Sequence, residues 1–195
     1  MTEKSSSESL NKLETFRQAQ TAMRNGYANG SIGIIVSGLI WLTSAIIAYQ
    51  YSAPKAIWVL FIGGMFIYPL SMLISKLIGL AGTHNKGNEL GNLAMEGTIW
   101  MIMCIPLAFG LSLQQVEWFF QAMLLIIGGR YLTFNTIYGN KIYWVLGAIL
   151  GLSAYLLYNF KAQSFETLLT GSFIEISFGL FMFISFRRDN KTTLK

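Results

Sequence analysis

The sequence predicts an all-α, polytopic integral membrane protein, a bundle of six transmembrane helices. Of its 195 residues, 53% are hydrophobic and only 12% are charged, whereas a soluble domain carries about 25% charged residues to cover its surface. Six apolar runs lie at residues 31–51, 56–75, 93–113, 116–138, 142–160 and 167–186. Each is close to the roughly 20 residues that a helix needs to cross hydrocarbon. Helices are expected because a helix satisfies its own backbone polar groups in lipid.

Residues 1–29 form a polar segment before the membrane domain of residues 30–186. Leu10, Leu13, Phe16, Gln20 and Met23 recur every three or four residues, and Lys12, Arg17 and Arg24 lie off that line. This spacing favours a short amphipathic helix on the inner leaflet. A partly frayed tail is the alternative, since "SSSES" is typical of disorder. Residues 187–195 are expected to form a basic cytoplasmic tail.

The distribution of lysine and arginine predicts the orientation, because these residues resist translocation. With six spans, the side that holds both termini carries eleven of them: Lys4, Lys12, Arg17, Arg24, Lys76, Lys86, Lys141, Arg187, Arg188, Lys191 and Lys195. The other side carries only Lys55 and Lys161. We therefore expect a plasma (inner) membrane protein with cytoplasmic termini and no cleaved signal peptide. The net charge of +5 follows from this topology, and no basic folded domain for nucleic acid is expected.

Short similarities suggest an internal repeat of three spans. "KAIWVLFIGG" from Lys55 resembles "KIYWVLGAIL" from Lys141, at the start of spans two and five. "GTIWMIM" from Gly97 and "GSFIEIS" from Gly171 open spans three and six. A 3+3 inverted repeat would make the halves antiparallel, with a shared cavity near the midplane. Chance similarity is the alternative, because apolar sequences match easily and "GSIGIIV" at Gly30 has no counterpart in span four.

Small residues predict which helix faces meet protein. In span six, Gly171, Glu175 and Gly179 are spaced by four residues, and small residues mark contact faces between membrane helices. Glu175 is therefore expected to face protein or a cavity. An ionisable group inside a membrane is by default a candidate for function. In span five, Gly147 and Gly151 form the same close-packing pattern.

Arg130 is the most unusual residue of span four. Gln121, Gly128 and Asn135 share one stripe of that helix, and Arg130 lies about 180° from Gln121 at 100° per residue. A charge at this depth costs about 2.5 kcal/mol or more. Three interpretations remain open: the guanidinium snorkels to lipid headgroups, it forms an ion pair with a carboxylate of span three or six, or it belongs to a working site. We regard Arg130 as structural first.

The candidate residues for binding a solute or an ion are the polar groups that the helix patterns place inside the bundle. They are Glu175, Arg130, Glu96, Tyr68, Ser71, Gln121 and Asn135. Glu96 lies near the cytoplasmic end of span three. Tyr68 and Ser71 share a stripe of span two, beside Pro69, which should kink the helix and free a carbonyl.

The sequence lacks the residue sets of most enzymes. It has one aspartate, Asp189, one histidine, His84, and one cysteine, Cys104. No HExxH motif, paired aspartates or glycine-rich phosphate loop occurs. His84 lies in the loop "GTHNKGNELGN", where one histidine and a nearby glutamate do not make a metal site. We expect no enzyme activity, no cofactor and no metal.

Two function classes remain. A small transporter or channel would bind an ion, a proton or a solute through Glu175 with Arg130 or Glu96. It is favoured by the intramembrane ionisable groups, the prolines and the suspected repeat. The alternative is a non-catalytic assembly or regulatory protein, favoured by the small number of polar groups. The expected partners are membrane lipids and, through the small-residue faces, a second copy of the chain.

Overall fold

The computed structural model describes residues 2–83 and 87–192, with the side chains of residues 14–83 and 87–189. The loop residues His84 and Lys86 lie outside the described residues. All regular structure in the described part is helical: α1 (Thr2–Tyr27), η1 (Ala28–Gly30), α2 (Ser31–Gln50), α3 (Ala53–Leu77), α4 (Glu89–Ser112), α5 (Val116–Tyr138), α6 (Ile142–Asn159) and α7 (Ser164–Thr192).

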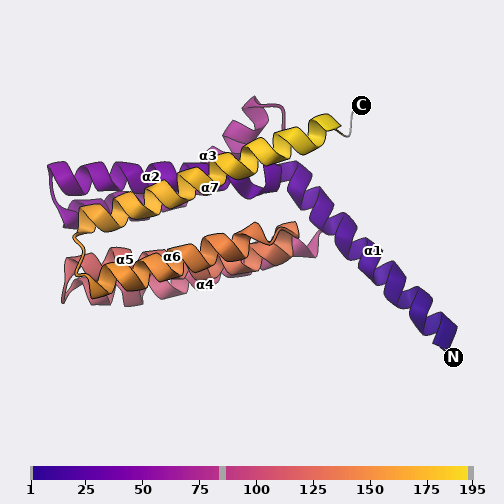
Figure 1. Ribbon diagram of the computed structural model, residues 1–195, viewed down its shortest axis with the longest axis horizontal. Coiled ribbons are helices and arrows are strands. Elements are labelled where there is room, and N and C mark those ends of the chain that lie inside the picture. Colours follow the sequence, from indigo (N-terminus) through magenta and orange to yellow (C-terminus); the bar gives the residue numbers. More distant parts are fainter. Residues whose placement is uncertain (1, 84–86, 193–195) are drawn as a thin grey trace.

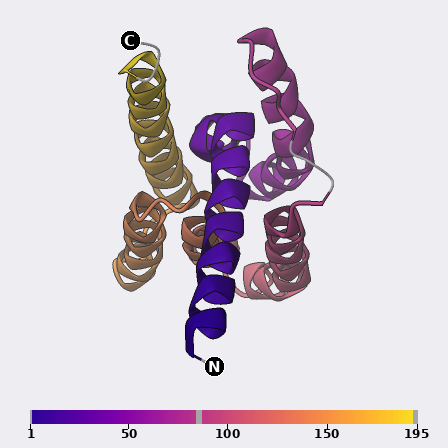
Figure 2. The ribbon, with the colours of Figure 1, turned by 90° about the vertical axis from the view of Figure 1, so that its right-hand side faces the viewer.

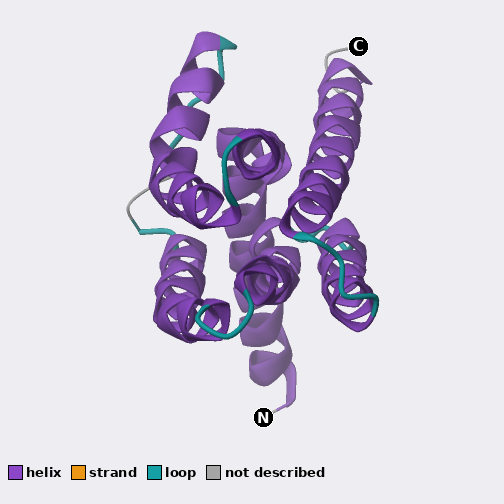
Figure 3. Cartoon of the chain, turned by 90° about the vertical axis from the view of Figure 1, so that its left-hand side faces the viewer, coloured by secondary structure: helices purple, strands orange, loops and turns teal. Residues whose placement is uncertain are grey.

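Helices α2 to α7 form two layers of three (Figure 1). In one layer α2 lies between α3 and α7, and in the other α5 lies between α4 and α6. The helices from α2 to α7 run alternately between two ends of the bundle. Both chain termini lie at one end, which we call the terminal end, and Figure 3 shows the opposite, distal end with its short connections. The architecture is therefore that of a membrane-type helical bundle, as the sequence predicts.

Five helical segments of the described residues are long and apolar enough to span a membrane. They are Glu14–Gln50, which contains α2, and Ala53–Leu77, Glu89–Ser112, Ile142–Asn159 and Ser164–Asp189. Helix α5 is long enough, but its polar residues, Glu117, Gln121, Arg130 and Asn135 among them, lower its mean hydropathy. The count of six crossings therefore stays a prediction that depends on α5.

Helices α2 and α7 approach each other closely because glycines leave room for backbone. A Cβ atom on Gly38 would lie 2.7 Å from Ile176 Cγ1 and 3.0 Å from the Ile176 nitrogen. A Cβ atom on Gly179 would lie 2.6 Å from Ile35 Cγ1. The small-residue stripe of span six is therefore a packing face, and this prediction is confirmed.

Helices α5 and α6 meet in the same way. A Cβ atom on Gly147 would lie 2.6 Å from the Gly128 carbonyl oxygen, and one on Gly128 would lie 2.9 Å from the Gly147 oxygen. The two backbones are thus in direct contact, as membrane helices with small residues at the interface often are. The close packing predicted for Gly147 is confirmed, whereas a Cβ on Gly151 would make only ordinary contact with Leu125.

Helix α1 is longer than its apolar stripe predicts and begins at Thr2. It crosses the terminal end of the bundle and passes beyond the layer of α4, α5 and α6 (Figures 1 and 2). Met23, from the stripe, is 2% exposed, and Gln20 Nε2 donates to the Thr136 carbonyl oxygen at 2.7 Å. The C-terminal part of this stripe therefore faces the bundle.

Helix α3 contains Pro69, and its C-terminal part rises out of its layer (Figures 1 and 2). A proline inside a helix removes one backbone hydrogen bond and kinks the helix. The predicted bend of this span agrees with the observed course of α3.

Candidate functional site

Glu175 carries the most deeply buried carboxylate among the described residues, with 0% exposure. Gly171, one turn before it on α7, lies where three helices meet: a Cβ atom there would be 2.8 Å from Leu124 of α5 and 3.0 Å from Trp41 of α2. A Cβ on Gly38 would lie 3.2 Å from the Glu175 Cβ. Close packing against two layers thus excludes solvent from the carboxylate. The prediction that Glu175 faces protein is confirmed.

The carboxylate has a direct partner from the other layer. Tyr131 of α5 donates its hydroxyl to Glu175 Oε1 at 2.8 Å, and Tyr131 is itself 5% exposed. The hydroxyl of Ser37, on α2, lies beside both side chains. The second oxygen, Oε2, is buried without a hydrogen-bond partner. One oxygen of the carboxylate therefore accepts a hydrogen bond, and the other has no hydrogen-bond partner.

Sequence reasoning did not select Tyr131 as a site residue. A tyrosine in an apolar helix is common and is compatible with either lipid or protein. The available signal was the spacing of seven residues that links Leu124, Tyr131 and Tyr138, which are all buried on α5. This spacing marks a helix face but does not say which side chain that face meets.

Arg130 faces the α4–α5 contact inside one layer. Its Nη2 donates to Thr98 Oγ1 at 3.0 Å, and Nη1 lies 3.9 Å from Met101 Sδ. The guanidinium also lies over the Phe134 ring, 5.2 Å from its centroid. Its Nε is buried without a hydrogen-bond partner. The neighbouring helix therefore satisfies part of this charge.

The ion pair considered for Arg130 is not present among the described residues. The polar partners of its guanidinium are Thr98 and Met101, and the Glu96 side chain is exposed. Glu175 instead bonds Tyr131. The structure therefore corrects the ion-pair interpretation: Arg130 is held by a hydroxyl, a thioether and an aromatic ring.

The remaining candidates are not among the hydrogen-bond partners of Glu175. Gln121 is 5% exposed and donates from Nε2 to the carbonyl oxygens of Leu157 and Ala162, both at 3.4 Å. Tyr68 is 59% exposed, and Ser71 donates to its carbonyl oxygen at 2.8 Å. Asn135 is half-buried on α5. The structure therefore does not bring the seven candidates into one site.

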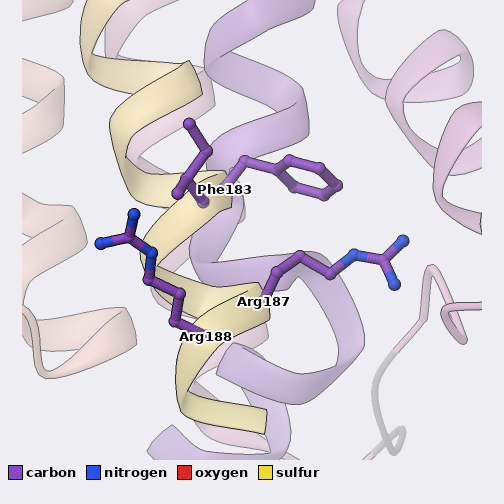
Figure 4. A pocket seen from close by; sticks show the side chains of 4 residues that line it. Phe183, Arg187 and Arg188 are labelled. Carbon is purple, nitrogen blue, oxygen red and sulfur yellow. The ribbon is translucent and has the colours of Figure 1, made fainter. Parts of the chain in front are cut away.

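Two surface pockets lie elsewhere on the described part. One of about 240 Å³ is lined by Phe183, Ile184, Arg187 and Arg188 near the C-terminal end of α7. Figure 4 shows the two arginines pointing to opposite sides of that helix. A groove of about 630 Å³ between α5 and α6 is lined by Leu132, Thr133, Thr136, Trp144 and Ala148. Neither pocket is lined by Glu175.

The chemistry open to this site is the binding of one small positive species. Within the described residues, no group of three or more histidine, cysteine or acidic side chains is placed to hold a metal ion. Glu175 Oε2 can accept a proton or contact one cation, because both would offset a charge that hydrocarbon does not solvate. Tyr131 and Ser37 supply hydroxyl groups beside it.

Comparison with known proteins places the chain in a family. No curated protein and no solved structure matches it. The model of a family described as a family of unknown function, DUF7010, matches residues 16–185. This match includes α2 to α6 in full, the C-terminal part of α1 and most of α7, with both Tyr131 and Glu175. The chain therefore belongs to the DUF7010 family.

Proposed function

We propose that this protein is a small multi-pass transporter that exchanges a proton or a small cation at Glu175. The observation that carries the proposal is a fully buried carboxylate with one held and one unpartnered oxygen, at the junction of the two helix layers. A buried acceptor without a partner costs free energy. In a membrane, such groups mark ion and proton pathways. The proposal includes six crossings of a plasma membrane and no enzyme activity.

The helix packing supports a 3+3 inverted repeat as part of this proposal. The first span, α2, packs against the second and sixth spans, α3 and α7. The fourth span, α5, packs against the fifth and third spans, α6 and α4. A shift by three spans converts one set of neighbours into the other. Each layer then contains two helices of its own half and one of the other half. Many transporters have such antiparallel halves, with the binding site where the two repeats meet.

The proposed repeat also relates the position of Glu175 to a position in the other half of the chain. Aligning Gly97 with Gly171, as the sequence similarity suggests, places Met101 in register with Glu175. Met101 contacts Arg130 of the central helix α5, and Glu175 packs against Gly38 of the central helix α2. Corresponding positions of the two halves thus lie beside the two central helices. The hydrogen bond from Tyr131 to Glu175 joins the layers.

Exchange at Glu175 requires the layers to move, because the carboxylate is closed off by packing. Transporters with repeats achieve alternating access largely by rocking one unit against the other. Here the moving units are the layer of α2, α3 and α7 and the layer of α4, α5 and α6. We expect proton or cation binding at Oε2 to change the strength of the hydrogen bond from Tyr131. This change would favour one arrangement of the layers over the other.

The test is flux in proteoliposomes with a panel of ion gradients and small solutes, read with an internal pH indicator. We expect Glu175→Gln to abolish coupled proton or cation flux while the protein stays folded. The matched control is Glu166→Gln, which changes an exposed acid at the start of the same helix. Equal flux in Glu175→Gln and the wild type would overturn the proposal. No flux in any protein would favour the alternative, a non-catalytic assembly or regulatory protein.

A further inference from the structure

The turn between α1 and α2 has a strained backbone. Ala28, Asn29 and Gly30 have φ angles of 48°, 57° and 75°. A left-handed conformation suits glycine, but it costs free energy for a residue with a Cβ atom. Two adjacent non-glycine residues in this region persist only where the surroundings hold them. The Asn29 Oδ1 atom is also buried without a hydrogen-bond partner.

Tyr143, at the start of α6, holds this turn. Its hydroxyl donates to the Asn29 carbonyl oxygen at 2.6 Å, and Tyr143 is 0% exposed. The fit is tight, because a Cβ on Gly30 would overlap the Tyr143 hydroxyl and lie 2.9 Å from the Tyr138 ring. One hydrogen bond between the layers therefore helps to hold the strained turn over the terminal end of the bundle.

Three tyrosine rings connect this turn to Glu175. Tyr143 stacks on Tyr138 with centroids 5.5 Å apart, and its centroid is 6.0 Å from that of Tyr131. Tyr131 in turn donates to the Glu175 carboxylate. All three rings are at least nine-tenths buried. The space between η1 and Glu175 is thus filled by side chains that must separate before water can enter from the terminal end.

The chain before the turn fastens to the opposite layer. We call residues 14–30, the end of α1 with η1, the strap. The strap continues into α2, yet Gln20 bonds the Thr136 carbonyl of α5 at 2.7 Å. Asn88, which caps α4, donates to the Ala19 carbonyl at 3.0 Å. Figure 2 shows α1 lying across this end of the bundle.

We propose that the strap is a gate that closes the Glu175 site at the terminal end, with the Tyr143–Asn29 hydrogen bond as its latch. The meaning of the gate for transport rests on the proposed function, but the closure itself does not. Breaking the latch loses one hydrogen bond and lets Ala28 and Asn29 leave the left-handed region. The free energy lost with the hydrogen bond and the free energy gained by relief of backbone strain oppose each other. A small difference in free energy is therefore sufficient to open or close the strap.

The test measures water access beside Glu175 by thiol labelling. Cys104 is first replaced by serine, and Ser37→Cys, at a position 5% exposed, becomes the reporter. An impermeant maleimide is added to vesicles whose terminal end faces the reagent. We expect Tyr143→Phe to increase the labelling rate about tenfold, as loss of one hydrogen bond predicts. Tyr155→Phe is the matched control on the same helix, at a position 64% exposed, and should leave the rate unchanged.

Two further variants keep the proposal testable if Tyr143→Phe does not fold. Gln20→Ala removes a surface bond of the strap and should also increase labelling. Ala28→Gly relieves backbone strain in the closed form and should reduce it. Wild-type labelling rates in Tyr143→Phe, or in Gln20→Ala if the former is unfolded, would overturn the gate. Faster labelling without any flux would support the gate and overturn the transporter proposal. Unchanged labelling with Glu175-dependent flux would overturn the gate and support the transporter proposal.

Discussion

Tyr131 and Glu175 are hydrogen bonded at 2.8 Å across the two helix layers, inside the bundle and away from solvent. The donor comes from the central helix of one layer and the acceptor from an outer helix of the other. The bond therefore couples the position of the layers to the state of the carboxylate.

Tyr131→Phe should destabilise the protein by about 1 kcal/mol or more, because it removes the hydroxyl that donates to the buried Oε1 of Glu175. The measurement is the free energy of unfolding in detergent micelles, obtained by denaturant titration. In a Glu175→Leu background the same change should cost less, since no acceptor remains. Equal losses in both backgrounds would show that the hydrogen bond does not contribute.

Gly38→Ala and Gly33→Ala, both on α2, should have different effects on stability. A Cβ on Gly38 would overlap Ile176, whereas one on Gly33 meets nothing within 4 Å. We expect Gly38→Ala to destabilise the α2–α7 contact and Gly33→Ala to be neutral or stabilising, since alanine restricts the unfolded backbone. Thermal unfolding of the two purified variants in the same detergent measures the difference. A destabilised Gly33→Ala would contradict the packing described here.

Met101→Glu should be tolerated only when Arg130 is present. The new carboxylate would lie beside Nη1, which now faces the Met101 sulfur at 3.9 Å, and guanidinium binds carboxylate well. A double-mutant cycle with Arg130→Met should give a favourable coupling of about 1–3 kcal/mol. Met103→Glu is the control, because Met103 is 73% exposed and has no such partner. A coupling near zero would place the guanidinium elsewhere.

The terminal end should face the cytoplasm. We expect a cysteine at Ser5, in a chain with Cys104 replaced by serine, to react with an impermeant reagent only after the cells are permeabilised. A cysteine at Gln163, in the α6–α7 connection at the distal end, should react in intact cells. The physical basis is the excess of lysine and arginine at the terminal end. The reverse pattern of labelling would invert the orientation.

The sequence alone was sufficient for features that depend on one helix and its solvent. Hydrocarbon does not solvate charges or free backbone groups, so composition and run length predicted the helical membrane-type bundle. The spacing of Gly171, Glu175 and Gly179 correctly predicted a buried acid, and Gly147 a close helix contact. These inferences hold because helix periodicity assigns each residue a face. The sixth crossing, the orientation and the repeat stay predictions.

Only the tertiary structure decided which faces meet. Three interpretations of Arg130 were open, which were snorkelling, an ion pair with a carboxylate and a working site, and its guanidinium bonds Thr98 of α4. Tyr131 meets Glu175, and Tyr143 meets the turn at Asn29, although 44 and 114 residues separate these pairs. Periodicity gives the direction of a side chain around its own axis. The partner depends on how helices are ordered and cross, which is set by the packing of all of them together.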